Sequence, residues 1–192
     1  MFEPIYRQAT HAIRIPLDTA DCLSLFTPEG ERSWVPGWEP EYLHPRDGRT
    51  TAGMVFRTGH GEEETLWTMV DYEPDLGRAR YCRVTPGSRA VLVEVVCTAA
   101  GPGETDVRVT YRLTGFSPAG NAFIERFVGP AFVAMIEEWQ TLILATLAAE
   151  SAAVRSGHLG RGPVDRLRRS TIHDRGPRWS APSGNPPKAQ EG

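Results

Sequence analysis

Cysteine is scarce in this sequence, and the spacings typical of metal-binding cysteine and histidine sites are missing. The three cysteines, Cys22, Cys82 and Cys97, contain no CxxC or CxxH pair, and the five histidines contain no HxH or HxxxH pair. We therefore expect no metal, and we interpret the cysteines as reduced, partly buried thiols of a cytoplasmic protein. Cys82 and Cys97 could face each other on neighbouring strands.

The sequence also lacks the common catalytic and nucleotide-binding motifs. It contains no GxSxG, Walker A or GxGxxG motif, so it predicts no cofactor and leaves the catalytic residues, if there are any, unknown. His60 stands close to three glutamates at 62–64, which could form an acid–base or metal-binding cluster. Glycine flanks this histidine on both sides, however, so the segment fits a solvated hairpin tip better.

Charge and hydropathy exclude further classes of protein. The net charge of −3 gives no general attraction to nucleic acid or to anionic membranes. No continuous apolar run approaches the roughly 18 residues of a membrane span, and the N-terminus lacks the regions of a secretion signal. We expect no nucleic-acid partner and no membrane span, and the sequence leaves open whether the chain forms a homodimer.

Residues 157–192 differ in composition from the rest of the chain. They are rich in glycine, proline, serine and arginine, and they carry a charge of +4 out of the total of −3, which leaves −7 on residues 1–156. Few apolar side chains are available there to offset the loss of chain entropy on folding. We therefore predict one domain over residues 1–156 and a basic, mostly disordered tail over 157–192.

Alternating residues predict a sheet that is buried on one face. A first strand is predicted at residues 10–16, and capping signals at Asp18 and Thr27 predict two short helices after it. Five further strands are predicted between residues 51 and 116, where β-branched and aromatic residues alternate between turn signals. Their alternation of apolar and polar residues is typical of an antiparallel sheet covered on one side.

A long amphipathic helix is predicted after the sheet. A serine–proline signal at 117–118 opens it, and apolar residues recur at helical spacing over 123–147. We expect the helix to end near Ser156 and to kink or break at Gly129, because the following proline removes a backbone hydrogen bond. A curved sheet wrapped around this helix, with the two short helices at its open end, would leave a cavity.

Four short sequence words carry a resemblance to a known superfamily. They are FTPEGER at 26–32, WVPGW at 34–38, RVTPGSR at 83–89 and SPAGN at 117–121. Together with the element order β-α-α-β(6)-α, they resemble the START/Bet v 1-like superfamily, also called SRPBCC, and its bacterial polyketide cyclase/dehydrase-like or uncharacterised branch. The resemblance covers residues 9–150 and implies an α+β helix-grip fold. Lipid carriers, hormone receptors, aromatase/cyclases and co-chaperones share this fold, so the fold alone does not select a function.

Aromatic residues are the main candidates for ligand contacts. They can fill the core, or they can line a cavity and stack on a flat or apolar ligand, and both roles are compatible in this architecture. The ligand-binding residues predicted on this basis are Trp34, Trp38, Trp67, Tyr81, Arg83, Tyr111, Phe132, Met135 and Trp139.

The direction of Arg83 decides its role. Arg83 alternates in phase with Tyr81, so both face inward or both face outward. An inward guanidinium needs an anionic ligand group or an acidic partner. In the opposite phase Cys82 and Val84 face inward and Arg83 is a surface charge, and the sequence leaves both alternatives open.

Three functions agree with these features. The first is binding of a small hydrophobic or aromatic molecule, such as a lipid, a polyketide or a similar metabolite, between the sheet and the helix. The second is a cyclase/aromatase-type enzyme acting on a polyketide-like substrate, with Tyr81, Tyr111, Arg83 or Glu94 as acid–base candidates. Glu94 is the weakest of these, because its valine neighbours occupy the inward face. The third is a co-chaperone-like interaction domain.

Overall fold

The computed structural model describes residues 1–60 and 63–155 of the chain. The tail predicted at 157–192 lies outside these residues, and the cluster predicted around His60 and the glutamates at 62–64 lies partly outside them. The domain boundary predicted near residue 156 therefore stays a prediction.

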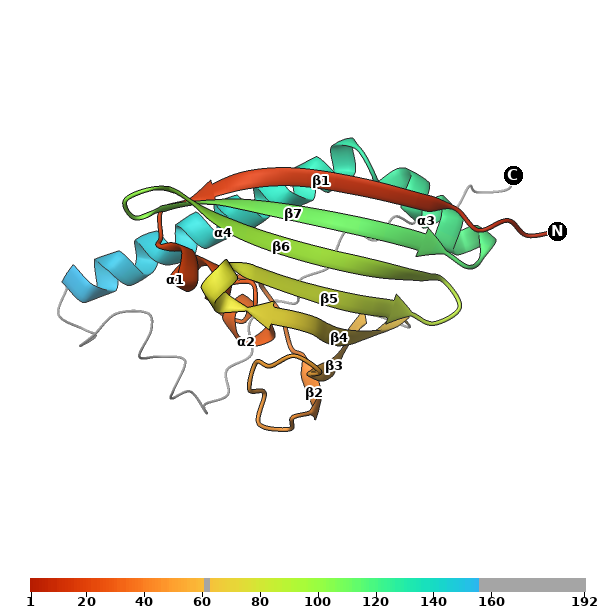
Figure 1. The fold of residues 1–192 in the computed structure, drawn as a ribbon, viewed down its shortest axis with the longest axis horizontal. Coiled ribbons are helices and arrows are strands. Elements are labelled where there is room, and N and C mark those ends of the chain that lie inside the picture. The colour runs from red at the N-terminus through yellow and green to blue at the C-terminus, as the bar shows by residue number, and fades with distance from the viewer. Residues whose placement is uncertain (61–62, 156–192) are drawn as a thin grey trace, which may run out of the picture.

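The described residues form seven strands, four α-helices and one short 3-10 helix (Figure 1). Their order confirms the predicted α+β class, with two short helices after the first strand and the longest helix at the end. The elements are β1 (Tyr6–Ile15), α1 (Thr19–Ser24), α2 (Pro28–Glu31), β2 (Glu41–His44), β3 (Val55–His60), β4 (Glu63–Glu73), η1 (Pro74–Leu76), β5 (Arg78–Thr85), β6 (Arg89–Gly101), β7 (Glu104–Gly115), α3 (Pro118–Phe127) and α4 (Pro130–Arg155).

The seven strands form one antiparallel sheet in the order β1-β7-β6-β5-β4-β3-β2. Strands β2 to β7 follow one another along the sheet, as short connections require. Strand β1 lies beside β7 instead, with Tyr6 opposite Thr114 and Ile15 opposite Thr105. The element order β-α-α-β(6)-α implied a sixth strand after the short helices, but the position of β2 was not identified, because four residues are too few to show an alternating pattern.

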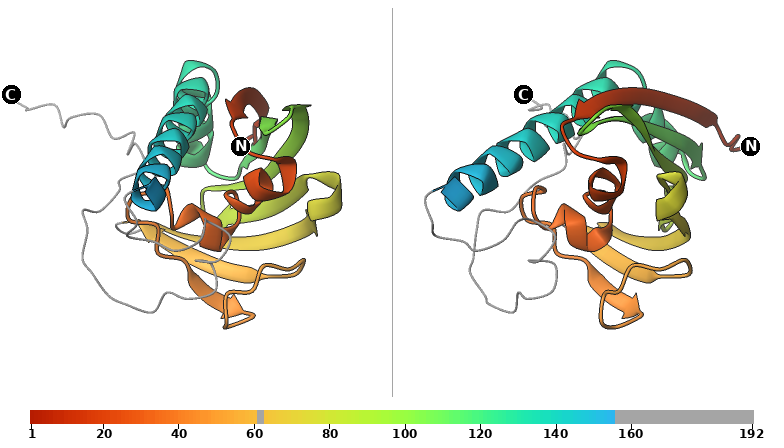
Figure 2. Two further views of the ribbon diagram at one scale, coloured as in Figure 1. Left: turned by 90° about the vertical axis from the view of Figure 1, so that its left-hand side faces the viewer. Right: turned by 60° about the vertical axis from the view of Figure 1, so that its left-hand side comes forward.

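The concave face of the sheet holds the core. Every second residue is buried from Val91 to Cys97 on β6 and from Val107 to Leu113 on β7. This confirms the prediction that one face is covered. Helices α1, α2 and α4 lie on the concave side, and α4 runs along β1 (Figure 2).

The C-terminal helix is broken at Gly129, as the sequence predicted. Helix α3 ends at Phe127, and Gly129 has a φ of 83°, in the left-handed region that favours glycine. Pro130 then begins α4, at a position where its missing N–H leaves no hydrogen bond unmade. The side chains that α4 buries are Phe132, Ile136 and Ile143.

By length and composition alone, α4 is long and apolar enough to cross a membrane. A core helix of a globular protein meets the same test. In this fold α4 packs on β1, and apolar side chains such as Leu144 and Val154 are exposed on its other side. The expectation that the chain has no membrane span therefore depends on the packing of α4 and not on its composition.

Two of the predicted helix caps are confirmed. Thr27 Oγ1 accepts a hydrogen bond from the N–H of Gly30 at 3.0 Å, and Ser117 Oγ accepts one from the N–H of Gly120 at 3.1 Å. Asp18 precedes α1 at the N-cap position, but its side chain makes no capping hydrogen bond.

The thiol pair predicted between Cys82 and Cys97 is wrong. Cys97 faces the core, where it belongs to the same buried cluster as Cys22 of α1, whereas Cys82 is half-buried on the outer face of β5, opposite Leu92. The neighbouring thiol of Cys97, together with burial, raises the pKa of Cys22. The partner on α1 could not be inferred from strand spacing, because it comes from the packing of α1 on the sheet. All three cysteines are free thiols, as expected.

Candidate functional site

Aromatic side chains gather on the concave side of the sheet in three contacting groups. Within the groups, ring centroids lie between 5.2 and 6.5 Å apart, the range of favourable aromatic pairs. The sheet group is Trp38, Phe56, Trp67 and Tyr81; the helix-side group is Tyr111, Phe123, Phe127 and Phe132; the plug group is Phe26, Trp34 and Trp139.

The tryptophans near α2 and the sheet differ in burial. Trp34 is buried as in an ordinary core, whereas Trp38 and Trp67 are only half-buried. The N–H group of each indole donates a hydrogen bond to a protein oxygen at 2.8 or 2.9 Å. The protein itself therefore satisfies their polar atoms, and ring surface is what Trp38 and Trp67 can still offer to a ligand.

Arg83 faces inward, which settles the phase that the sequence left open. Its neighbours in phase on β5, Ala79 and Tyr81, are buried on the same face. The guanidinium carbon lies 5.0 Å from the ring centroid of Trp67 and 5.3 Å from that of Tyr111, so the cation joins the sheet group to the helix-side group. Among the residues that the structure describes, none makes a hydrogen bond or ion pair with this guanidinium. Burial lowers the pKa of Arg83, but an arginine keeps its charge in proteins.

Glu31 brings a carboxyl group to the same region. It is the last residue of α2, it is half-buried, and its carboxyl makes no hydrogen bond or ion pair within the described chain. Burial raises the pKa of Glu31 to about 8, and the positive charge of Arg83 offsets only part of this effect. The charge of Glu31 also acts on Tyr81 and Tyr111, which places the carboxyl near both tyrosines. At pH 7 the carboxyl is therefore mostly protonated and can donate a hydrogen bond.

The two inward tyrosines differ in what their hydroxyl groups do. Tyr81 Oη donates a hydrogen bond to the carbonyl oxygen of Phe26 at 2.6 Å. Tyr111 is 3% exposed, and its hydroxyl makes no hydrogen bond to any residue that the structure describes. Burial raises the pKa of both tyrosines, so both hydroxyls keep their protons. Tyr81 therefore anchors the sheet to the segment after α1, and Tyr111 keeps a donor for a ligand.

A second arginine on this face is paired with a carboxylate through its terminal nitrogens, while its Nε has no hydrogen-bond partner among the described residues. Arg89 is 7% exposed, and its two terminal nitrogens each donate to the carboxylate of Glu63 at 3.1 Å. Its guanidinium carbon also lies 3.7 Å from the ring centroid of Phe123. Since Arg89 and Glu63 neutralise each other, Arg83 is the cation on this face that no described carboxylate pairs with.

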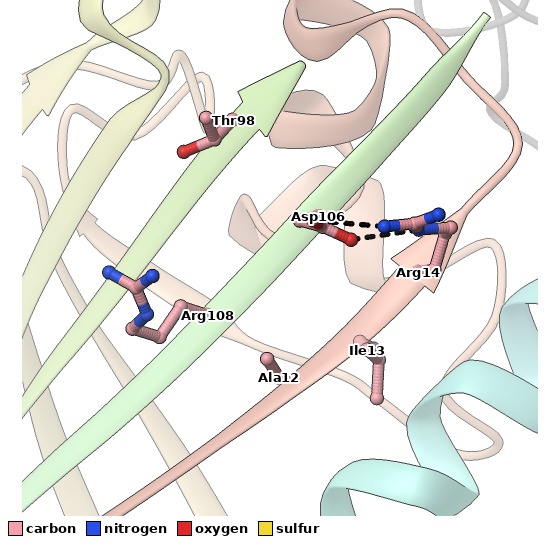
Figure 3. A pocket seen from close by; sticks show the side chains of 6 residues that line it. All are labelled: Ala12, Ile13, Arg14, Thr98, Asp106 and Arg108. Atoms are coloured by element: carbon pink, nitrogen blue, oxygen red, sulfur yellow. Dashed lines mark hydrogen bonds and ion pairs between the residues drawn. The ribbon is translucent and has the colours of Figure 1, made fainter. Parts of the chain in front are cut away.

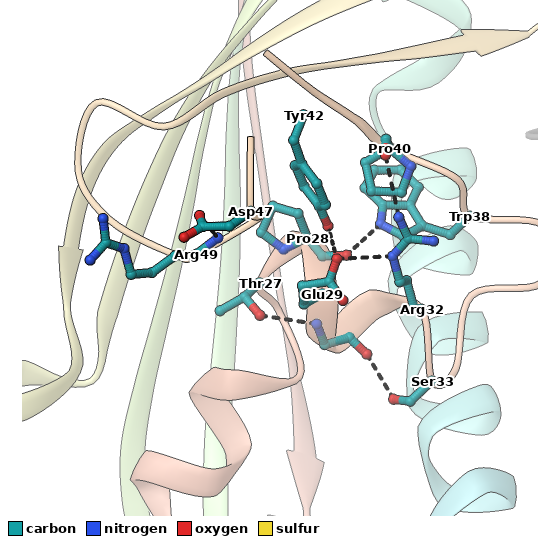
Figure 4. Close-up of polar contacts among 11 residues, drawn as sticks. Thr27, Pro28, Glu29, Arg32, Ser33, Trp38, Pro40, Tyr42, Asp47 and Arg49 are labelled. Atoms are coloured by element: carbon teal, nitrogen blue, oxygen red, sulfur yellow. Dashed lines mark hydrogen bonds and ion pairs between the residues drawn. The ribbon is translucent and has the colours of Figure 1, made fainter. Parts of the chain in front are cut away.

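A polar cluster on the outer side of α2 fixes the orientation of this short helix (Figure 4). Tyr42 donates a hydrogen bond to the carboxylate of Glu29, and Arg32 Nε donates to the same carboxylate at 3.0 Å. Arg32 also donates to the carbonyl oxygen of Pro40 at 3.3 Å. Residues two positions apart on a helix differ by about 200° in direction. Holding Glu29 on the outside therefore turns Glu31 toward the sheet.

Two surface hollows lie apart from the Arg83 region. One, of about 320 Å³, lies on the outer side of β1, β6 and β7, where the exposed Arg14–Asp106 ion pair and Arg108 line it (Figure 3). The other, of about 470 Å³, lies between residues 32–37 and α4. The first has no aromatic lining, and neither includes Arg83. The cavity predicted between sheet and helix therefore stays a prediction.

The predicted ligand-binding residues other than Arg83 all belong to one hydrophobic core or pack against it, but they do not all touch one another. Trp67, Tyr81, Arg83 and Tyr111 come together on the concave face, with Trp38 against Trp67. The remaining members lie around α4: Trp34 and Trp139 pack with Phe26, Phe132 is buried in the helix-side group, and Met135 packs half-buried against the core.

The structure alters the set of acid–base candidates predicted from the sequence more than it alters the set of aromatic candidates. Glu94 lies on the outer face, as its valine neighbours indicated, with its carboxylate 3.6 Å from Arg112. Glu31 was not predicted, because a one-turn helix shows no periodicity from which its inward face can be identified. The only available signal was its spacing of two residues from Glu29.

Comparison with solved structures supports the architecture. No protein-family model and no curated protein matches the sequence. Norcoclaurine synthase from Thalictrum flavum is similar with a TM-score of 0.54 at 13% identity, over 73% of this chain and 88% of that chain. TTHA0849 from Thermus thermophilus gives 0.54 at 15%, over 74% and 99%, and Ara h 8.0201 gives 0.52 at 12%, over 74% and 99%. The chain has the Bet v 1-like helix-grip fold, as predicted, and identities this low establish the fold alone.

Proposed function

We propose that this chain is a cytoplasmic protein that binds a small, largely apolar or aromatic molecule on the concave face between the sheet and α4. The observation that carries the proposal is the half-buried ring surface of Trp38 and Trp67 near the guanidinium of Arg83, which pairs with no carboxylate among the described residues. A core that only filled space would bury such rings and pair such a cation. A ligand that covers the rings and approaches the guanidinium accounts for both.

A neighbour of the same fold supports this proposal. Norcoclaurine synthase from Thalictrum flavum has been solved in complex with dopamine and hydroxybenzaldehyde, two small aromatic molecules. The helix-grip fold can therefore accommodate a flat ligand. The remaining predicted residues, Trp34, Phe132, Met135 and Trp139, would shape the space around it in our proposal.

Binding can be tested without knowing the ligand. Mass spectrometry of the purified, denatured protein should reveal a co-purified apolar compound, and a panel of lipids and aromatic compounds should raise the melting temperature. A ligand at a hundred times its Kd adds about 2.7 kcal/mol to the unfolding free energy. Absence of both a co-purified compound and a thermal shift across the panel would refute the proposal.

A matched pair of variants tests where on the protein the ligand binds. Met135→Trp adds bulk on the half-buried side of α4 and should abolish the thermal shift, whereas Thr141→Trp adds the same bulk on an exposed position and should leave it intact. Equal ligand responses in the two variants would place the binding region elsewhere.

One arrangement favours a cyclase/aromatase-type enzyme as a second candidate. Glu31, Tyr111 and Arg83 bring a protonated carboxyl, a hydroxyl that bonds to no described residue, and a cation into one region. In an intramolecular aldol closure, the enol form of one ketone attacks a second carbonyl. As the new carbon–carbon bond forms, the enol loses its O–H proton to water and regains its C=O bond, and the second carbonyl oxygen takes a proton. These groups could supply that proton and stabilise the negative charge that develops on the oxygen.

The enzyme candidate predicts a clear difference between tyrosine variants. With a poly-β-ketone substrate, Tyr111→Phe should lower kcat by about a hundredfold, while Tyr81→Phe, whose hydroxyl is engaged with Phe26, should retain kcat. Ring closure at the rate of the protein-free control would eliminate this candidate and leave the binding proposal intact.

A further inference from the structure

We propose that the ligand carries a carboxylate group, which Arg83 binds beside the rings of Trp67 and Tyr111. This inference rests on the proposed function and deepens it by naming the polar part of the ligand. It follows from the charges and donors that the concave face leaves unmatched.

The charge balance around Arg83 comes first. Arg89 and Glu63 neutralise each other through two hydrogen bonds of 3.1 Å. Glu31 is the other acid whose charge acts on Arg83, and the two groups form no ion pair in the described part of the chain. With Glu31 protonated, the face keeps one positive charge, so it favours a ligand with one negative charge.

The donors around this charge are also unmatched. A guanidinium carries five N–H groups, and those of Arg83 donate to no described residue. Trp67 and Tyr111 attract the charge through their rings, but a ring is no substitute for an oxygen acceptor. A carboxylate presents two oxygens in a spacing that matches the planar guanidinium, and such paired hydrogen bonds are among the strongest in proteins.

Glu31 gives the interaction a pH dependence with a definite sign. Below about pH 8 the Glu31 carboxyl is uncharged; above that value it ionises, compensates the charge of Arg83 and repels the ligand carboxylate. The titratable groups that face it are Tyr81 on β5 and Tyr111 on β7, and burial raises the pKa of both, while Arg83 keeps its charge. Carboxylate affinity should therefore fall as pH rises through 8.

The test compares two probes that differ only in charge. Isothermal titration with naphthalene-2-carboxylate and with naphthalene-2-carboxamide, at pH 6.5 and pH 9.5, measures the preference for the carboxylate. We expect the carboxylate to bind about thirtyfold more tightly at pH 6.5, and the preference to shrink at pH 9.5. Glu31→Gln, which keeps a donor that does not ionise, should keep the preference at both pH values.

Variants of two arginines separate the inward cation from an ordinary surface one. Arg83→Met should remove the preference for the carboxylate and keep carboxamide binding. Arg112→Gln, on the outer face beside Glu94, is the matched control and should behave as the unaltered protein. If Arg83→Met does not fold, the comparison of the two probes on the unaltered protein still decides the question.

Two results would overturn the inference. If the carboxamide binds as tightly as the carboxylate at pH 6.5, Arg83 does not recognise a carboxylate, although the proposed function stands. If neither naphthalene probe binds, the inference also fails. The proposed function fails with it only if the wider apolar panel produces no thermal shift and no compound co-purifies.

Discussion

Glu31 shows how burial changes the chemistry of a single side chain. In an unfolded chain a glutamate has a pKa of about 4.3, whereas burial raises that of Glu31 in the folded protein to about 8. Between these two values the folded state holds a proton that the unfolded state has released. The free energy of unfolding attributable to Glu31 therefore falls as pH rises from about 4.3 to 8.

The first prediction removes this ionisation. Glu31→Gln keeps the shape of the side chain, so it should leave stability near pH 4 unchanged and raise the free energy of unfolding at pH 8 by about 2 kcal/mol. Water that reaches the half-buried carboxyl keeps this gain below the full value of the pKa shift. Urea denaturation at pH 4, 6 and 8 measures it. A difference that stays constant with pH would show that Glu31 titrates normally.

The second prediction contrasts the two inward tyrosines. Tyr81→Phe leaves the buried carbonyl of Phe26 without its 2.6 Å hydrogen bond, and it should lower the free energy of unfolding by about 1–2 kcal/mol. Tyr111→Phe removes a hydroxyl that bonds to no described residue, so its effect should stay within about 0.5 kcal/mol. Thermal and chemical denaturation of both variants, side by side, would show the contrast. Equal losses would contradict the assignment of the two hydroxyls.

Only some of the individual residues of the candidate functional site could be predicted from the sequence. The aromatic candidates are large apolar residues that any core would gather, so naming them required no knowledge of the fold. The phase of Arg83 remained open because either face of β5 offered plausible inward residues. Glu31 depends on how the outer contacts of Glu29 turn a helix of one turn, and these contacts involve Tyr42, which is distant in sequence.

At the scale of elements, α2 is too short to be stable alone, so contacts fix its position. Gly30 lies against the first short helix so closely that a Cβ atom would be 1.9 Å from the carbonyl oxygen of Ser24. The third prediction is that Gly30→Ala displaces α2 and lowers the free energy of unfolding by about 2 kcal/mol or more. The shift should also weaken the pH dependence of ligand binding, since Glu31 moves with the helix.

Gly101→Ala is the control for this change. A Cβ atom there would meet its nearest neighbour at 3.9 Å, which is ordinary contact, so stability should change by about 0.5 kcal/mol or less. Denaturation curves for the two alanine variants make the comparison. If Gly30→Ala is as stable as Gly101→Ala, the close contact with Ser24 does not position α2.

The longer strands and helices could be predicted from local sequence patterns, whereas the contacts between these elements could not. Alternation predicts strands at residues 78–86, 88–99 and 105–116, and β5, β6 and β7 begin and end within two residues of these bounds. The proline after Gly129 marks the break between α3 and α4. The pairing of Cys22 with Cys97 and the enclosure of Arg83 arise when helices and sheet pack together. No pattern within one strand contains that information.

For the molecule as a whole, the rate at which each thiol reacts shows whether the fold must open before a reagent can reach that thiol. Cys82 is half-buried on the outer face, whereas Cys22 and Cys97 are buried where α1 covers the sheet. The fourth prediction is that a thiol reagent modifies Cys82 in the native protein and reaches the other two only as fast as the fold opens. Cys82→Ser should remove the fast phase. Rapid modification of Cys97 in native protein would contradict the burial of this pair.

The position of β1 at the edge beside β7 has a consequence for protein synthesis. Ile15 pairs with Thr105, so the ribosome must add about 90 residues before the first strand can meet its partner. The hairpins from β3 to β7 can form while the chain is still growing, but β1 stays unpaired until β7 emerges. Helix α4 packs on β1 and is translated later still. The first strand made is thus among the last to be paired, and the nascent chain carries β1 without its partner until β7 has been made.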